Sequence, residues 1–248
     1  MKEKLELNSL ALKTRRMMNE DEYSPIDLFS LVNLWREKNF TIVHYPMSDN
    51  ISGMCTRVDN ETIICINSKS SYGRQRFTLA HELYHCLYEE SLNRIVCGMS
   101  FVEKKSDSEK EADAFASYLL IPYDALIKYS ENISTWTLED IINAEQYFQI
   151  SHMAMLTRLR SEGMITKKEY QDNSIQHVAL EASKMGYGKE LYLQFPKEYY
   201  TTGEYIRKVE EMREKNLISN GKREELLLDA FRPDIVFNLE EEGVTTDD

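Results

Sequence analysis

The sequence predicts an α+β fold in which a small mixed or antiparallel sheet packs on two neighbouring helices and is followed by a mainly helical lobe. Three observations lead to this class. Residues 40–45, 53–58 and 62–66 are short runs of strand-forming residues. Residues 74–90 contain no glycine or proline and carry enough apolar positions for a buried helix. The patterns after Pro122 are helical.

Length and composition are those of an ordinary globular protein. The 248 residues are 42% hydrophobic and 29% charged, enough for one large domain or two small ones. The formal net charge of -12 opposes non-specific binding to nucleic acid or anionic membranes. No stretch approaches the roughly 18 apolar residues of a membrane span, and residues 1–20 lack the apolar core of a signal peptide. We therefore expect a cytoplasmic protein with reduced cysteines.

The first elements along the chain are two helices and the strands of the sheet. Residues 5–19 form a weak amphipathic pattern, and a second helix is expected to start at Pro25, a favoured first-turn residue. In the sheet, Asp59 and Asn60 are expected to form the turn between the last two strands.

The most specific motif is His81-Glu82-x-x-His85, which lies within the uninterrupted helical segment. Histidines four residues apart lie one turn apart on one face of a helix, so their ring nitrogens can converge on one metal ion. The carboxylate of Glu82 can then reach a water in the open position of a zinc ion and act as general base. The alternative is a helix with two incidental histidines.

A third protein ligand is expected because two ligands leave a zinc ion under-coordinated. Residues 111–122 predict a second helix, with Ser106 or Ser108 as its N-cap. Glu111 borders the apolar stripe of this helix, whereas Glu109 is turned well away from Glu111 by the helical step. We therefore expect Glu111 to be the third ligand. The alternative is a solvated first-turn glutamate favoured by the helix dipole.

The second half of the chain predicts a helical lobe over residues 131–239. Within it, residues 137–163 read as a helix-turn-helix-like unit. Its second helix offers only Arg158 and Arg160 as long basic side chains, so a scaffold or partner-docking role is favoured over direct DNA binding. The acidic residues 240–248 predict a disordered tail.

The paired motifs resemble those of the ImmA/IrrE family of metallo-endopeptidases, which are gluzincin-like zinc peptidases. Residues 77–85 read Phe-Thr-Leu-Ala-His-Glu-Leu-Tyr-His, and residues 111–122 read Glu-Ala-Asp-Ala-Phe-Ala-Ser-Tyr-Leu-Leu-Ile-Pro. The similarity extends from the strand that ends at residues 64–67 to near Leu226.

The resemblance implies a zinc metallopeptidase domain over residues 1–130. It implies that His81, His85 and Glu111 bind one zinc ion, with manganese as the other possible metal, and that Glu82 is the catalytic base. Members of this family cleave helix-turn-helix repressors and so derepress genes of mobile elements, phages or stress responses. The expected partner is therefore a cytoplasmic repressor that serves as substrate.

The sequence departs from the family pattern at two positions, and the groups that would hold the substrate and stabilise the oxyanion lie outside the two motifs. Tyr84 stands where glycine usually precedes the second histidine, and Asp113 stands where asparagine is common. A tyrosine beside the metal is expected to narrow the cleft or to supply a hydroxyl. An edge strand at residues 62–66 is expected to hold an extended substrate by main-chain pairing. The donor to the oxyanion stays open among these groups: His44, His152, His177, Tyr84, Tyr88 or an arginine.

Two other function classes remain possible. One is a non-catalytic regulator that binds a repressor or DNA through the helical lobe. The other is a toxin or hydrolase that acts on a non-peptide substrate with the same zinc scaffold. The oligomeric state is not predicted by the sequence.

Overall fold

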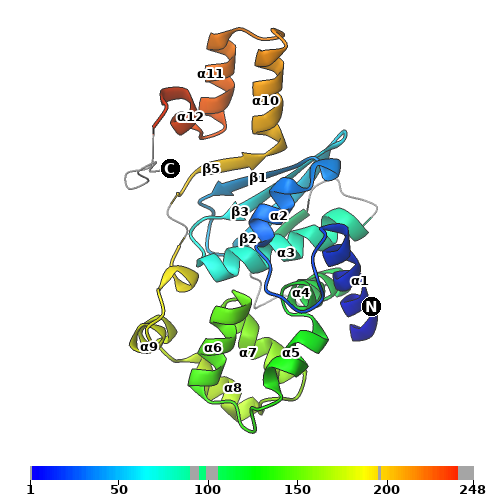
Figure 1. The fold of residues 1–248 in the computed structure, drawn as a ribbon, viewed down its shortest axis with the longest axis vertical. Coiled ribbons are helices and arrows are strands. Elements are labelled where there is room, and N and C mark those ends of the chain that lie inside the picture. Colours follow the sequence, from blue (N-terminus) through cyan, green and yellow to red (C-terminus); the bar gives the residue numbers. More distant parts are fainter. Residues whose placement is uncertain (1, 90–94, 99–105, 195–196, 240–248) are drawn as a thin grey trace.

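The computed structural model describes residues 2–89, 95–98, 106–194 and 197–239, and confirms the α+β class (Figure 1). The strands are β1 (Phe40–Tyr45), β2 (Ile51–Val58), β3 (Glu61–Asn67), β4 (Ile95–Gly98) and β5 (Tyr200–Gly203). The α-helices are α1 (Lys4–Met17), α2 (Leu28–Leu34), α3 (Tyr72–Tyr88), α4 (Asp107–Leu120), α5 (Tyr123–Ser130), α6 (Leu138–Phe148), α7 (His152–Ser161), α8 (Lys167–Ser174), α9 (Val178–Lys184), α10 (Glu204–Glu214), α11 (Asn220–Asp229) and α12 (Pro233–Phe237). Two 3₁₀ turns, η1 (Arg36–Lys38) and η2 (Glu190–Tyr192), complete the elements of the described residues.

The five strands of the described chain form one mixed sheet in the order β4-β2-β3-β1-β5. β1 and β3 are parallel, whereas the β2–β3, β1–β5 and β2–β4 pairs are antiparallel. The expected turn between β2 and β3 is present, because β2 ends at Val58 and Asp59 takes a left-handed φ of 53°. Aspartate is one of the few residues that tolerate this conformation without glycine.

The expectation that residues 62–66 form an edge strand is wrong. These residues belong to β3, which lies inside the sheet: Ile64 pairs with Ile42 of β1 on one side and with Cys55 of β2 on the other. Because both neighbours already use its backbone groups, β3 has no free edge on which a peptide could be added. Within the described residues, the sheet ends at β4 and β5.

Helix α3 packs on the sheet, and α4 packs beside it (Figure 1). The position of α4 is fixed at its C-terminal end by Arg15 of α1, a fully buried side chain. Its guanidinium donates to the carbonyls of Leu119 and Leu120 at 2.8 and 3.3 Å, and to those of Asp21 and Ser24. Buried arginine thus satisfies carbonyls that the end of a helix leaves without intrahelical partners.

Helices α6 and α7 lie within residues 137–163, where the sequence predicts a helix-turn-helix-like unit, and their assignment to that unit stays a prediction. α6 begins with a capping box in which Thr137 and Asp140 satisfy each other's backbone N–H groups. One hydrophobic core runs from Leu7 through α3 and α4 to Ile165, so it includes α5, α6 and α7. The expected boundary near residue 130 therefore falls within one continuous core, and the domain limits stay a prediction.

The C-terminal part contains one strand that the sequence did not predict. Residues 200–203 form β5, which pairs with β1 and returns the chain to the sheet before α10, α11 and α12 extend beyond that edge (Figure 1). The predicted disordered tail, residues 240–248, lies outside the described residues. None of the helices in the described ranges has the length and apolar character of a membrane span.

Candidate metal centre

Helix α3 presents the His-Glu-x-x-His motif on its buried side. Leu79 and Leu83 of the same helix are fully buried in the core, and this packing holds the helix in a fixed rotation. His81 and His85 lie one turn apart, at 6% and 1% exposure, and Glu82 is fully buried. The motif is therefore built on a rigid helix and not on a loop.

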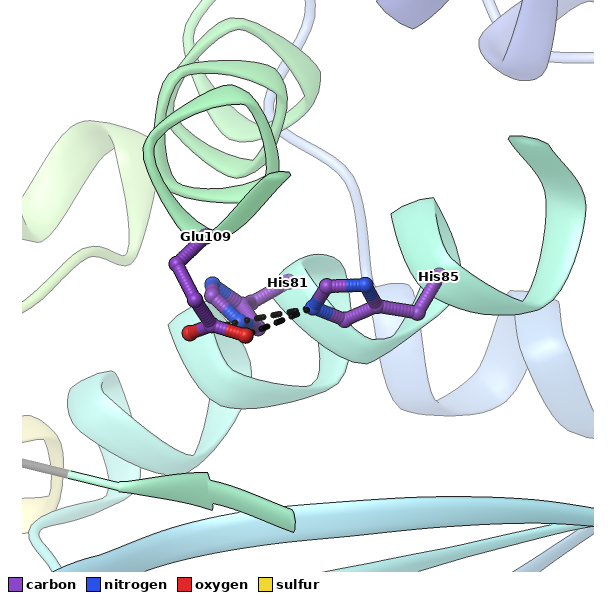
Figure 2. A group of neighbouring side chains, drawn as sticks. All are labelled: His81, His85 and Glu109. Carbon is purple, nitrogen blue, oxygen red and sulfur yellow. Dashed lines mark hydrogen bonds and ion pairs between the residues drawn. The ribbon is translucent and has the colours of Figure 1, made fainter. Parts of the chain in front are cut away.

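The two histidines meet a carboxylate from the neighbouring helix, that of Glu109 on α4 (Figure 2). The Nε2 atoms of His81 and His85 are 3.2 Å apart, and each lies 3.4 Å from an oxygen of Glu109. Metal–ligand bonds of about 2.0–2.1 Å give a tetrahedron with edges of about 3.3 Å. The two Nε2 atoms have the spacing of two ligands of a tetrahedral ion, and Glu109 directs one oxygen to each of them, Oε2 to His81 and Oε1 to His85. Two nitrogens with one carboxylate leave a fourth position for water.

Each histidine has a second carboxylate at its other ring nitrogen. Nδ1 of His81 lies 3.0 Å from Oδ1 of Asp113, and Nδ1 of His85 lies 3.0 Å from Oε2 of Glu89. A carboxylate that is hydrogen-bonded to Nδ1, as Asp113 is to His81, keeps the proton there and leaves the Nε2 lone pair directed at a metal. Asp113, expected only as a departure from the family pattern, thus orients a candidate ligand.

The electrostatics of the cluster favour positive charge. Burial alone would lower the pKa of His81, but the carboxylates of Asp113 and Glu109 outweigh it and raise that pKa to about 9. Hydrogen bonds with His81 and His85 lower the pKa of Glu109. Protons therefore occupy this site when no cation does, and a metal that binds must displace them. Metal affinity is expected to fall as the pH falls.

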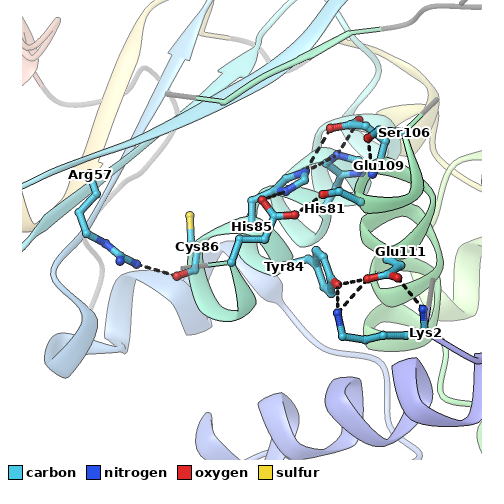
Figure 3. A network of polar contacts seen from close by, with 11 residues as sticks. Lys2, Arg57, His81, Tyr84, His85, Cys86, Ser106, Glu109 and Glu111 are labelled. Atoms are coloured by element: carbon cyan, nitrogen blue, oxygen red, sulfur yellow. Dashed lines mark hydrogen bonds and ion pairs between the residues drawn. The ribbon is translucent and has the colours of Figure 1, made fainter. Parts of the chain in front are cut away.

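Glu111 does not join this cluster, which corrects the expectation that it supplies the third donor. Its Oε2 accepts from the hydroxyl of Tyr84 at 2.6 Å and from Nζ of Lys2 at 2.8 Å, away from the histidines (Figure 3). These hydrogen bonds outweigh the effect of burial and lower the pKa of Glu111 to about 2. The reason is helical geometry: two residues along a helix turn a side chain by about 200°, so Glu109 and Glu111 cannot face the same group.

Glu109 and Asp113 are the two site residues that the sequence reasoning missed. They lie four residues apart, so they share one face of α4 and both reach His81. An acidic pair at this spacing next to a His-Glu-x-x-His helix was the signal available in the sequence. Ser106, one of the two expected caps, does cap α4 by accepting from the N–H of Glu109, and this places Glu109 in the first turn.

Glu82 lies against the sheet at a point where β2 carries a glycine. A β-carbon at Gly53 would lie 2.6 Å from Cγ2 of Thr78 and 3.1 Å from Oε1 of Glu82. The absence of a side chain therefore allows β2 to approach α3 closely and leaves room for the Glu82 carboxylate. The sequence alone does not indicate this role for Gly53.

A cleft of about 480 Å³ opens beside the metal cluster, lined by α3, α4, α7 and β2 and including His81, Glu82 and Glu109. Tyr84 does not line it: this residue is 1% exposed, and its hydroxyl is bonded to Glu111 and Lys2. Substitution of the usual glycine by tyrosine therefore does not narrow the cleft.

Of the side chains expected as donors to an oxyanion, only arginines line the cleft. Among the named candidates, the histidines at positions 44, 152 and 177 and the tyrosines at positions 84 and 88 do not line the cleft. Two arginines do, Arg74 and Arg158. Arg74 lies seven residues before His81, two turns away on the same face of α3, and donates to the hydroxyl of Ser52 at 3.0 Å. The arginine alternative is the one that this geometry supports.

A buried His-Glu-x-x-His helix, a carboxylate from the next helix and an adjoining cleft together define a metallopeptidase centre. Residues 38–160 match the peptidase family described as the IrrE N-terminal-like domain, and the chain belongs to this family. The match runs from the end of η1 into α7, so it contains both ligand-bearing helices but stops short of Leu226, to which the resemblance was expected to extend. Comparison with curated proteins gives no match.

Proposed function

We propose that the protein is a zinc-dependent endopeptidase that cleaves a specific cytoplasmic protein, a helix-turn-helix transcriptional repressor, and so derepresses genes of a mobile element, a phage or a stress response. The observation that carries the proposal is the convergence of His81, His85 and Glu109 beside Glu82 at the wall of a cleft. The substrate class rests on the resemblance to the ImmA/IrrE family, and the open cleft is compatible with a polypeptide.

Zinc would be held by His81, His85 and Glu109, with Asp113 orienting His81 through its Nδ1. A bound zinc ion polarises a carbonyl and lowers the pKa of a coordinated water. Manganese is less suited to this donor set, because imidazole ligands favour zinc and manganese prefers oxygen.

Glu82 takes a proton from the attacking water and delivers it to the leaving amine. Glu82 is fully buried, its carboxylate acts electrostatically on the candidate ligand His81, and the residue contributes to the lining of the cleft. Arg74 projects into the same cleft and can donate to the developing oxyanion. Helix α3 therefore carries both the group that transfers the proton, Glu82, and the group that stabilises the oxyanion, Arg74.

The test compares cleavage and binding of a candidate repressor, chosen from a gene adjacent to that of this protein, in the presence of zinc. Glu82→Gln keeps the shape of the side chain but removes the base, so cleavage should fall by about 10²–10⁴-fold while binding of the repressor is retained. Glu131→Gln, an exposed glutamate after α5, is the matched control and should cleave normally. Equal activity of Glu82→Gln and wild type would overturn the proposal.

A further inference from the structure

The cleft has a third wall that belongs to neither of the ligand-bearing helices. Residues of α3 and α4 line it at spacings of three and four, and the same spacing recurs on α7 with Met153, Ala154, Thr157 and Ser161. Each helix therefore turns one stripe toward a common space. Because the α3 stripe ends at His81 and Glu82, this space is continuous with the metal centre.

Apolar side chains from all three helices line part of the cleft, next to the polar residues Thr157, Arg158 and Ser161 of α7. Phe77 of α3, Ala114 and Tyr118 of α4, and Met153 and Ala154 of α7 contribute to it. Phe77 lies four residues before His81, an axial distance of about 6 Å along α3. An extended polypeptide advances about 3.3 Å per residue, so a side chain within two residues of the scissile bond reaches this region.

Met153 is 45% exposed, although its neighbours Met155 and Leu156 are fully buried in the core. The exposed methionine is thus not needed to fill the core of the protein. Methionine is flexible and polarisable, and it adapts to apolar partners of different shape. Its position at an open cleft beside Ala154, a small residue that leaves space, suits an incoming apolar side chain.

Arg158 holds the wall in place. This side chain is 2% exposed, donates to the hydroxyl of Ser117 at 3.1 Å, pairs with Glu162 at 3.0 Å and lies 4.1 Å from the ring centre of Tyr118. These contacts tie α7 to α4 and neutralise the one cation that α7 turns toward the cleft. The wall is therefore preorganised and does not attract an acidic side chain.

We propose that the stripe of Met153, Ala154 and Thr157 on α7 is the specificity wall of the enzyme, and that it receives a bulky apolar side chain of the polypeptide substrate beside the scissile bond. The inference rests on the proposed peptidase function, because it assigns the occupant of the same cleft. By this inference, α7 recognises the substrate with the side that faces the cleft.

The first experiment measures binding without catalysis. Zinc-free protein with methionines labelled on the methyl carbon is titrated with acetyl-glycyl-leucine amide or acetyl-glycyl-serine amide, and the Met153 signal is assigned with Met153→Leu. The leucine probe should shift the Met153 signal and bind at least about tenfold more tightly than the serine probe. Met212, which is 39% exposed on α10 and does not line the cleft, is the internal control and should not shift.

Two variants test the location of the wall. Thr157→Phe adds bulk at an exposed position, so it should fold normally and weaken the leucine probe at least about tenfold by filling the space. Arg160→Phe places the same ring on the exposed side of α7 outside the cleft and should bind as wild type. Equal binding of both probes, or equal shifts at Met153 and Met212, would overturn the proposal.

The outcome separates this inference from the proposed function. Leucine-selective binding at Met153 without hydrolysis of any repressor would uphold the wall and overturn the peptidase proposal. Hydrolysis that depends on Glu82, together with probes that bind without preference, would uphold the peptidase and overturn the wall.

Discussion

Two glutamates on α4 allow the metal centre to be tested with a matched pair of substitutions. Glu109→Gln removes the anionic donor that lies 3.4 Å from each imidazole, whereas Glu111→Gln changes a carboxylate two residues away that bonds Lys2 and Tyr84. Loss of a partner outside the ligand shell already weakens metal binding by about 10–100-fold. Loss of a ligand should cost more, so Glu109→Gln should weaken zinc binding by more than about 100-fold, or about 2.7 kcal/mol.

Glu111→Gln should behave differently. Zinc affinity should stay close to that of the wild type, and the loss of charge-assisted hydrogen bonds should lower the free energy of unfolding by about 1–2 kcal/mol. The assay is a competition titration of zinc against a chelating dye, with denaturant unfolding of the metal-free proteins alongside. The assignment of the ligands would be refuted if Glu111→Gln lost zinc while Glu109→Gln retained it.

Two further predictions concern groups around the centre, and a third concerns the buried His44 of β1. Asp113→Ala should weaken zinc binding about 10–100-fold in the same titration, because Nδ1 of His81 loses its partner; unchanged affinity would contradict that role. Gly53→Ala should slow repressor cleavage more than it weakens zinc binding, because the new methyl group would lie 3.1 Å from Oε1 of Glu82, and a normal rate would contradict this. Burial lowers the pKa of His44 from 6.5 to about 4, so between these pH values the unfolded chain binds more protons and stability falls as the pH falls. About 3 kcal/mol present above pH 6.5 should be lost by pH 4, and His44→Gln should flatten that part of the unfolding profile; an identical profile would count against the assignment.

The local features of the fold were predictable because they depend on neighbours in the sequence. The His-Glu-x-x-His helix follows from its apolar spacing and the absence of glycine and proline. The caps at Ser106 and Thr137 follow from side chains that reach backbone N–H groups two or three residues on. In each case the physical cause lies within one or two helical turns.

The choice between Glu109 and Glu111 needed tertiary information. The apolar stripe of α4 indicates which side is buried, but it does not say from which direction α3 approaches. In the structure, Glu111 faces Tyr84 and Lys2, and the side with Glu109 and Asp113 faces the histidines. A requirement that one acidic residue binds the metal and another orients a histidine would have narrowed the choice to two pairs four residues apart, Asp107 with Glu111 and Glu109 with Asp113.

The order of the strands was also beyond local reasoning. Residues 62–66 were expected at an edge, yet β3 pairs on both sides. It forms an antiparallel hairpin with β2, and on its other side it pairs in parallel with β1, which precedes β2 in the chain. β5 spans only Tyr200–Gly203 and shows no alternating apolar pattern, so its strand state depends on the partner that β1 offers. Pairing between segments about 160 residues apart leaves no trace in either segment alone.

The way in which α1 and β5 complete the structure bears on how the enzyme can be trimmed for study. A fragment limited to residues 38–160 would retain His81, His85 and Glu109, yet it would lack Arg15, leaving the last carbonyls of α4 bare, and it would strip β1 of its outer neighbour. Such a fragment should aggregate and be poorly soluble even with its metal ligands intact, because an exposed edge strand can pair with strands of other chains. Boundaries for expression are therefore better drawn outside Lys4 and Gly203 than at the ends of the family match.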